Sequence, residues 1–315
     1  MRPPKVVIHG TVLFITTSIE EGILLPSILV FRLIIESILA RAQTLHPVRV
    51  CHLTVEGTHI HMLVVVDDPD DIKGFMERLK TESAHAINAF LGRKKRTVWC
   101  RGYDSPVLLT KGAVMDKISY LYSNAAKDGL EASISRYPGL NTWEMFTKKK
   151  LTMERPWLRR PVIRKIVEKG SMPTEAGPML TFSIYPDAWM DCLGIPAEER
   201  EQINRSIIES VAERERHYES VRQVQGRKVI GRQCLLESSF DPNYIPHRHG
   251  RRMLCICEDK PLRRAFLAWV REASTLRREV YQLWKKGDFS LPYPLGFYPP
   301  SLPKRAEILN LGLRP

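Results

Sequence analysis

Apolar and polar positions follow two different periods along the first half of the chain. Runs rich in β-branched residues at 5–18, 48–56 and 59–66 predict strands. Apolar residues recur at helical spacing over 24–45, and again from the capping-type sequence DDPD to about residue 91 (67–91), which predicts two amphipathic helices. The Gly-Thr pair between the second and third strands predicts a tight hairpin.

A further extended segment and a third helix complete this half. Residues 97–110 are predicted to be extended, with Pro106 at an edge or bulge, and 113–130 to be a helix that stops at Gly129. The first six elements have the order β-α-β-β-α-β of the split βαβ, or ferredoxin-like, pattern. That pattern predicts a four-stranded antiparallel sheet with two helices on one face. The third helix is then expected to lie across the open face.

The fold class expected for the whole chain is α+β. Its 315 residues exceed a usual single domain, so we expect a second domain or a large extension. The predicted parts are a ferredoxin-like domain with its additional helix (1–146), a basic Pro-containing connector (147–196), and a mainly helical basic region with a Pro-aromatic tail (197–315).

Two long helices are predicted in the last part of the chain. The first, 197–222, is densely charged, and the second, 261–286, is amphipathic. The expected core stripe of the second helix is Phe266, Trp269, Val270, Leu276, Val280, Leu283 and Trp284. The basic residues that surround this stripe are Arg263, Arg264, Arg271, Arg277, Arg278, Lys285 and Lys286. We expect the tail 293–303 to pack against a helix in extended form.

Two histidines open the strand 59–66. His59 and His61 are two residues apart, so both rings point to the same face of the strand. Two imidazoles on one face can share a metal ion, with oxygen ligands completing the coordination shell. A solvated strand end would carry the same pattern. A metal site is therefore indicated only if further candidate ligands lie elsewhere in the chain.

The third predicted helix offers such partners. Tyr120 and Asn124 are four residues apart and project from one face, whereas Tyr122 is rotated by about 200°. A tyrosine hydroxyl is a competent nucleophile toward phosphorus when a metal polarises the phosphate, and an amide oxygen could be a third metal ligand. Taken alone, Tyr120 would be interpreted as a core or interface aromatic residue.

The charge of the chain favours an anionic partner. Lys and Arg number 48 against 35 Asp and Glu, a net charge of +13, and residues 1–150 hold 20 of the basic and 15 of the acidic residues. Both halves are therefore basic, which indicates nucleic acid before membrane. The loop residues Arg93, Lys94, Lys95 and Arg96 are candidates for phosphate contacts, and a solvated loop is the alternative.

The six cysteines are scattered, without a disulfide framework, and no secretory signal or apolar stretch of membrane-spanning length is evident. We therefore expect a reducing cytoplasm. His247, His249, Cys255 and Cys257 do not have the usual spacing of zinc ligands. We interpret 247–252 as a basic DNA-contacting loop or a polar surface.

The segment 5–146 resembles the single-tyrosine HUH transposases, the insertion-sequence-200-like clan, and within it the REP-associated tyrosine transposases. The His-hydrophobe-His motif of that family is matched by HIH (59–61), and its helix motif Y-I-x-x-N-P-x-x-x-G-L by YLYSNAAKDGL (120–130). VWCRGYDSPVL (98–108) resembles the family's tryptophan-containing strand. The sequence departs from the family at Ala125, where proline is usual, and at Glu-Gly-Thr (56–58), where Met-Pro-Asn is usual.

The resemblance implies metal-assisted, strand-specific cleavage and joining of single-stranded or hairpin DNA. His59, His61 and Asn124 would hold Mg²⁺ or Mn²⁺, and Tyr120 would form a 5′-phosphotyrosine and release a 3′-hydroxyl. No ATP would be needed, and the sequence has no G-x-x-x-x-G-K-[ST] loop. The resemblance places the protein in a bacterial cytoplasm, associated with the nucleoid when bound to DNA. It leaves open whether the protein is a monomer or a homodimer.

Two other functions stay open. One is a catalytically silent protein of the same fold that binds hairpin DNA or RNA, and the presence of both histidines, the tyrosine and the asparagine favours the enzyme over it. The other is a replication initiator or relaxase, which predicts a helicase or primase domain that the chain does not indicate. For the half after residue 150 we favour a clamp on duplex DNA over a structural brace for the third helix, and we expect removal of 151–315 to separate the two roles.

Overall fold

A five-stranded sheet forms the centre of the protein in the computed structural model, which describes residues 5–19, 25–94, 96–169, 177–239 and 253–300. The strand order is β2-β3-β1-β4-β7. The strands are β1 (Val12–Ser18), β2 (Arg49–Val55), β3 (His59–Val65), β4 (Val107–Leu108) and β7 (Cys255–Ile256).

The first four strands have the predicted ferredoxin-like topology. β1 pairs antiparallel with both β3 and β4, and β2 pairs antiparallel with β3, so the histidine strand is central as expected. The predicted α+β class is confirmed. The prediction of a four-stranded, wholly antiparallel sheet is wrong in one respect, because β7 joins the outer edge of β4 in parallel. There it supplies partners for backbone groups that an edge strand would leave unpaired, as in Val107 N–H to Leu254 O (3.0 Å).

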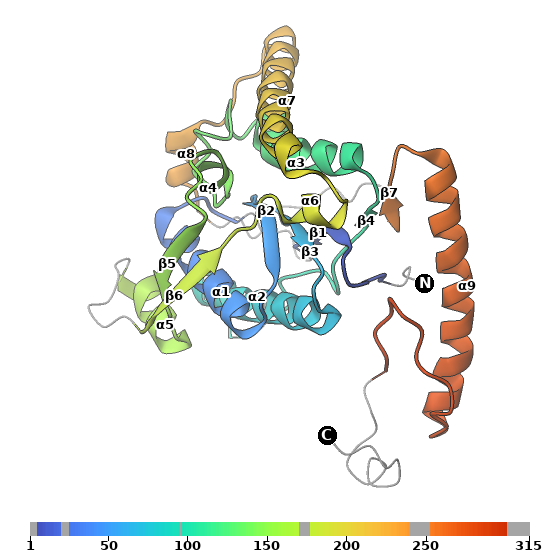
Figure 1. Ribbon diagram of the computed structural model, residues 1–315. Coiled ribbons are helices and arrows are strands. Elements are labelled where there is room, and N and C mark those ends of the chain that lie inside the picture. Colours follow the sequence, from blue (N-terminus) through green and yellow to red (C-terminus); the bar gives the residue numbers. More distant parts are fainter. Residues whose placement is uncertain (1–4, 20–24, 95, 170–176, 240–252, 301–315) are drawn as a thin grey trace.

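Helices cover both faces of the sheet (Figure 1). One face carries α1 (Leu29–Leu45) and α2 (Pro69–Phe90), and the other carries α3 (Lys111–Lys127). Thr110 caps α3 by accepting a hydrogen bond from the Ala113 N–H, and Gly129 follows its end with φ +69°, a left-handed conformation that suits glycine. The predicted third helix therefore lies across the face that the first two helices leave open.

The segment 97–110 is extended but irregular, and only its last part forms the two-residue strand β4. Isolated bridges join Asp104 to Thr16 and Trp99 to Ile19, so the segment follows β1 without continuous pairing. The break falls at Gly102, where a positive φ of 74° turns the backbone away from strand geometry.

The segment predicted as a connector folds onto the first helix. It contains the end of α4 (Trp143–Thr147), then β5 (Thr152–Pro156), α5 (Arg160–Lys169), β6 (Met179–Ser183) and α6 (Ala188–Cys192). The antiparallel pair β5–β6 is attached to α1 by hydrogen bonds from Ser37 Oγ to Pro156 O (2.7 Å) and from Gln43 Nε2 to Ser183 O (2.9 Å). Phe182 and Trp189 are fully buried in the same core as the sheet.

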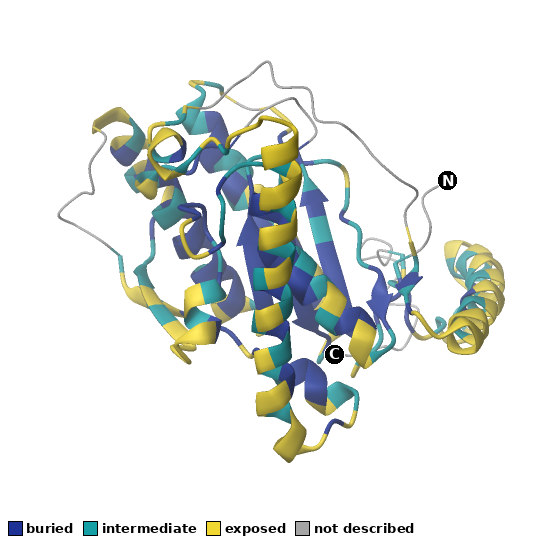
Figure 2. Cartoon of the chain, turned by 90° about the horizontal axis from the view of Figure 1, so that it is seen from above, coloured by how far each residue is buried: buried dark blue, intermediate teal, exposed yellow. Residues whose placement is uncertain are grey.

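The charged helix α7 (Ala197–Val224) packs along α3 on the side away from the sheet (Figures 1 and 2). Its buried residues Ile203, Ile207 and Val211 are four positions apart and form one face. Ion pairs join the two helices, Arg214 to Asp116 at 2.6 Å and Glu199 to Lys111 at 3.0 Å. The short helix α8 (Arg232–Leu236) follows.

The last helix, α9 (Lys260–Lys285), lies at the periphery and is largely exposed (Figure 2). Its predicted core stripe is only partly buried: Val270 and Val280 are enclosed, whereas Trp269 and Leu276 are 36% and 45% exposed. The reason is that α9 packs on the edge strand β7 and on the tail that follows the helix rather than on a face of the sheet. The tail packs on α9 as predicted, through ring contacts such as Trp284 to Tyr293, but up to residue 300 the predicted extended form is interrupted by a turn at residues 295–296.

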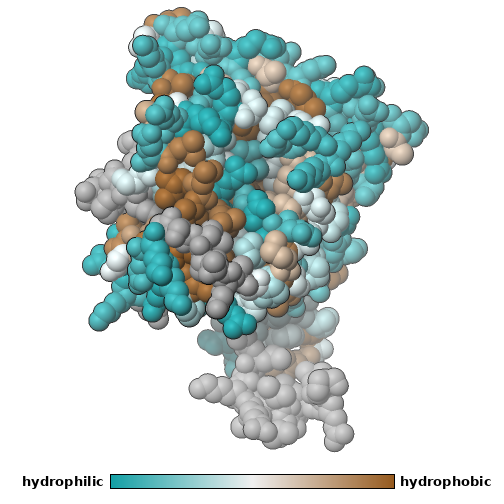
Figure 3. Space-filling view, turned by 90° about the vertical axis from the view of Figure 1, so that its left-hand side faces the viewer, coloured by the Kyte–Doolittle hydropathy of each residue, from teal (hydrophilic) through white to brown (hydrophobic). Residues whose placement is uncertain are grey.

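The outer surface is mostly hydrophilic. Seen from the side where Figure 1 places α8, β5, β6 and α5, polar side chains surround a limited apolar area (Figure 3). Among the described residues, no helix combines the length and apolar character needed to span a bilayer.

Candidate active site

The two histidines lie on the face of β3 that α3 covers. The β2–β3 hairpin turns tightly between Val55 and Ile60, and the Glu56 N–H donates to the carbonyl of His59 (2.9 Å). His59 and His61 therefore project side by side, with ring centroids 4.3 Å apart. They are the strand pair that the i, i+2 spacing predicts.

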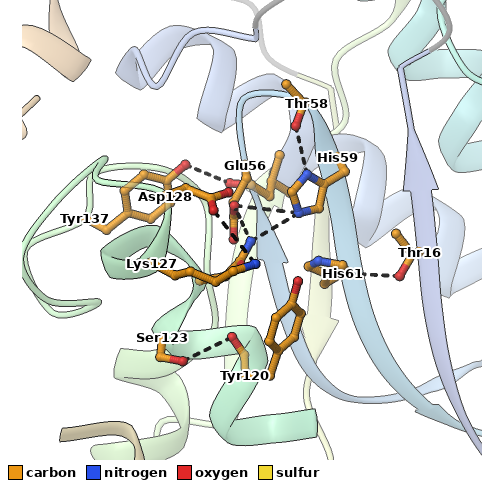
Figure 4. A network of polar contacts seen from close by, with 12 residues as sticks. Thr16, Glu56, Thr58, His59, His61, Tyr120, Ser123, Lys127, Asp128 and Tyr137 are labelled. Carbon is orange, nitrogen blue, oxygen red and sulfur yellow. Dashed lines mark hydrogen bonds and ion pairs between the residues drawn. The ribbon is translucent and has the colours of Figure 1, made fainter. Parts of the chain in front are cut away.

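Each imidazole is oriented by a neighbouring hydroxyl (Figure 4). His59 Nδ1 lies 2.8 Å from Thr58 Oγ1, and His61 Nδ1 lies 2.9 Å from Thr16 Oγ1 on β1. When each Nδ1–H donates to its hydroxyl, the Nε2 lone pairs are left free, which is the tautomer that a metal ligand needs.

Burial keeps both rings neutral. Burial, with a smaller contribution from the charge of Lys127, lowers the pKa of His59 to about 4. Burial also lowers the pKa of His61 well below its ordinary value, with smaller contributions from the His59, Lys127 and Lys117 charges. A neutral imidazole is the form that binds cations.

The two tyrosines of α3 have different surroundings. Tyr120 is partly exposed, and its ring centroid lies 5.6 Å from that of His61, with the hydroxyl directed toward that histidine (Figure 4). Tyr122 is fully buried, and its hydroxyl lies 2.9 Å from both His52 Nδ1 and Thr142 Oγ1. Tyr122 is therefore fixed within a buried polar network, whereas Tyr120 faces the histidine pair and is open to a substrate.

Asn124, one turn after Tyr120, faces the same histidines. Its Nδ2 donates to Glu56 Oε2 (2.7 Å) and lies 3.3 Å from His59 Nε2, while its Oδ1 has no partner among the described residues. Glu56 was not among the sequence-based candidates. Burial raises the pKa of its carboxyl to about 8, and the hydrogen bond from Asn124 opposes that shift.

Several buried polar atoms at this place lack hydrogen-bond partners in the described part of the chain. They are His61 Nε2, Asn124 Oδ1 and Glu56 Oε1. Unpartnered buried acceptors are rare, and all three are atoms that bind divalent cations. The donor set therefore fits a metal ion in its chemistry. The described residues do not hold a preformed cluster of three His, Cys, Asp or Glu ligands. The Asn124 NH₂ group lies 2.7 Å from Glu56 Oε2 and 3.3 Å from His59 Nε2.

Two lysines add positive charge beside Tyr120. Lys117 Nζ and Lys127 Nζ lie 5.0 Å and 5.1 Å from the centroid of its ring. Burial raises the pKa of the Tyr120 hydroxyl, and the charge of Lys127 opposes this shift by stabilising the phenolate. Lys127 is three residues after Asn124, so helical spacing could have identified it; Lys117 is three residues before Tyr120.

The other predicted contact residues lie apart from this cluster. The basic loop follows α2, where Asn88 Nδ2 donates to the carbonyl of Arg96 (2.9 Å). Arg93 and Lys94 belong to the same loop, and Lys95 is outside the described residues. The loop leads to Trp99, which bridges to Ile19 at the same end of the sheet as the β2–β3 hairpin. His247 and His249 are also outside the described residues, while Cys255 and Cys257 are buried near β7.

Residues 30–118 match the family described as "Transposase IS200 like". That part of the chain is therefore similar to the IS200-like transposases. The match includes both histidines and ends two residues before Tyr120, so the tyrosine and Asn124 lie just beyond it. No curated protein matches the chain.

A solved structure described as a REP-associated tyrosine transposase bound to a REP hairpin is also similar to this chain. The two are 14% identical, the alignment covers 48% of this chain and 87% of the other, and the TM-score is 0.40. The family named from the sequence motifs is thus confirmed by the family match. The chemistry of the site is a separate question, which depends on the geometry of His59, His61, Tyr120 and Asn124.

Proposed function

We propose that the protein is a metal-dependent DNA strand transferase that cleaves and rejoins single-stranded or hairpin DNA through a 5′-phosphotyrosine. Tyr120 is the nucleophile, and His59, His61 and Asn124 are the metal ligands. The observation that supports this proposal is the convergence of residues from two distant segments, β3 and α3, on one point where buried acceptor atoms have no partners.

In the proposed reaction the Tyr120 oxygen attacks the scissile phosphorus as the phenol gives up its proton. The new O–P bond forms as the bond from phosphorus to the 3′-oxygen breaks, and the 3′-oxygen leaves as a hydroxyl after taking a proton. Lys117 and Lys127 attract the phosphate and stabilise the phenolate. Attack by a 3′-hydroxyl on the phosphotyrosine reverses the chemistry and rejoins DNA without ATP.

A divalent metal, Mg²⁺ or Mn²⁺, would polarise the phosphate oxygens and neutralise the charge that develops at phosphorus. The neutral Nε2 atoms of His59 and His61 and the Asn124 amide oxygen would hold it. Thr16 and Thr58 keep the imidazoles in the required tautomer.

The test is to incubate the full-length protein with a panel of 5′- and 3′-labelled hairpin and single-stranded oligonucleotides and Mn²⁺ or Mg²⁺. We expect a denaturation-resistant protein–DNA adduct that retains the DNA on the 3′ side of the cut, together with a released strand that ends in a 3′-hydroxyl. Chelation of the metal should abolish the adduct. Hairpin binding without adduct under every metal condition would favour the silent DNA- or RNA-binding function instead.

The basic loop after α2 is proposed as a phosphate contact. Arg93 and Arg96 lie at the end of the sheet that carries the β2–β3 hairpin, so DNA entering the site could reach them. Lys94 and Lys95 carry the same charge in the same loop and are included in this proposal on sequence grounds.

The half after residue 150 has two candidate roles, a structural brace for α3 and a clamp on DNA, and different helices suit each role. α7 packs on α3, and Phe182, Trp189 and Ile207 are buried in the shared core. These contacts support a bracing role for this part of the chain. Removal of 151–315 would expose that core and would not separate the two roles. We propose that α9, which is peripheral and exposed, contacts the DNA backbone.

Replacing Arg263, Arg264, Arg271 and Arg278 by Gln should weaken hairpin binding and reduce its salt dependence. All four are exposed, and none forms an ion pair within the described part of the chain. Each lost phosphate contact should lower the log–log slope of affinity against salt by about 0.9 on duplex DNA. Fluorescence anisotropy across a series of salt concentrations measures the slope.

The matched control changes the same number of charges on another exposed helix. Arg160, Arg164, Lys165 and Lys169 of α5 lie on the opposite side of the molecule from α9 (Figure 1). Their replacement by Gln should leave the slope unchanged. Equal slopes for the α9 variant and the wild type would show that α9 is solvated rather than bound to DNA.

A further inference from the structure

Glu56 lies at the centre of the site and has no role in the chemistry proposed above. It is only 2% exposed, its Oε2 accepts a hydrogen bond from Asn124, and its Oε1 has no hydrogen-bond partner among the described residues. A buried carboxylate is costly unless a cation or several donors offset its charge. A single amide donor does not provide that compensation.

The fold supplies no formal positive charge in contact with this carboxylate. Within the described residues, the basic group found within 4.0 Å of it is the His59 imidazole, which burial keeps neutral. Lys127 is placed beside the Tyr120 ring instead, 5.1 Å from its centroid. The position next to Glu56 is therefore one where an added cation would be stabilised.

The distances around Asn124 locate that position. Its Nδ2 lies between two acceptors, 2.7 Å from Glu56 Oε2 and 3.3 Å from His59 Nε2, and these acceptors are 3.6 Å apart. Two ligand atoms that each lie about 2.1 Å from one ion are separated by about 3 to 3.6 Å. Rotation of the Asn124 amide would replace the NH₂ group by the unpartnered Oδ1, a third acceptor.

The chemistry of hard cations points to the same group. Imidazole nitrogens suit the later transition metals, whereas Mg²⁺ and Mn²⁺ prefer carboxylate and carbonyl oxygens. We propose that Glu56 is a direct ligand of the divalent metal, so that the site is a set of two histidines, one asparagine and one glutamate. Glu56 is the first residue of the Glu-Gly-Thr departure from the family motif, so this ligand is a feature of this chain. The inference rests on the proposed function, because it assigns a ligand to the same metal.

The test measures the binding of Mn²⁺ alone to the full-length, DNA-free protein. Binding is monitored by electron paramagnetic resonance, in which the signal of the free ion decreases as Mn²⁺ binds. Glu56→Gln keeps an oxygen that accepts from Asn124 Nδ2 but removes the charge, so it preserves an orienting role and removes a carboxylate ligand. We expect it to weaken Mn²⁺ binding by about 10-fold or more, and Glu56→Asp to fall between it and the wild type. The Mn²⁺-dependent rise in Tm should shrink in the same order.

Glu131→Gln is the matched control, because Glu131 is a buried glutamate, 1% exposed, that pairs with Arg136 at 3.6 Å. It should bind Mn²⁺ as the wild type does. Equal Mn²⁺ affinity of Glu56→Gln and the wild type would overturn the Glu56 assignment and leave the proposed function intact. A wild-type protein that binds no Mn²⁺, with or without a hairpin oligonucleotide, would overturn both. If Glu131→Gln weakened Mn²⁺ binding as much as Glu56→Gln does, the loss would be a general effect of removing a buried charge. That result would overturn the Glu56 assignment.

Discussion

Tyr120→Phe should abolish the covalent protein–DNA adduct while leaving hairpin binding within about twofold of the wild type, a difference of less than about 0.5 kcal/mol. The substitution removes one oxygen from a partly exposed ring and leaves its contacts with His61 and Phe14 in place. Without that oxygen no phosphotyrosine can form. Denaturing electrophoresis detects the adduct, and anisotropy measures the binding.

Tyr122→Phe is the matched control on the same helix. It removes a buried hydroxyl that contacts His52 and Thr142, so it should lower the free energy of unfolding by about 1 to 3 kcal/mol. The adduct should persist. If Tyr122→Phe lost the adduct and Tyr120→Phe retained it, the assignment of the nucleophile to the histidine-facing side of α3 would be wrong.

His61→Phe should slow adduct formation by about three orders of magnitude, equivalent to about 4 kcal/mol of transition-state stabilisation. The phenyl ring can occupy the space between Phe14 and Tyr120 but offers no nitrogen to a metal. Single-turnover rates with Mn²⁺ and with Mg²⁺ measure the loss. Mn²⁺ affinity in the absence of DNA should fall together with the rate.

His52→Phe provides the comparison, because His52 is also a fully buried histidine of the same sheet. It packs against Tyr122 and Phe146 and is not directed at the nucleophile. The variant should be less stable but should form adduct at a rate near that of the wild type. Similar rate losses in the two variants would mean that His61 acts through stability rather than through a metal.

Local periodicity was sufficient to predict the elements that build the site. The i, i+2 spacing of His59 and His61 and the i, i+4 spacing of Tyr120 and Asn124 are properties of single elements, so they survive folding unchanged. The strand and helix order then constrained the topology to few arrangements. These are the features of the chain that sequence reasoning described well.

Features that depend on distant partners were not predictable in this way. β7 is a two-residue strand with no pattern of its own, and it pairs with β4 across about 150 residues of chain. Glu56 is a loop-end glutamate in the sequence and becomes buried only when distant parts of the chain, including Asn124 of α3, pack around it. The sequence correctly predicts that α9 is amphipathic. The apolar pattern of one helix, however, does not indicate how much of its apolar surface the neighbouring elements can cover.

The packing of α7 against α3 limits how far Tyr120 could move between the cutting and joining steps of the proposed reaction. Moving α3 out from between the sheet and α7 would break the Arg214–Asp116 ion pair and expose the Ile203, Ile207 and Val211 face, at a cost of about 5 kcal/mol or more. Each 1.36 kcal/mol is a factor of ten, so such an open form would be populated at roughly one part in several thousand or less. In the proposed mechanism, the tyrosine would therefore stay in place through the cycle. Exchange of one DNA end for another would then come from motion of the DNA, and a severed end that did not leave would be resealed where it was cut.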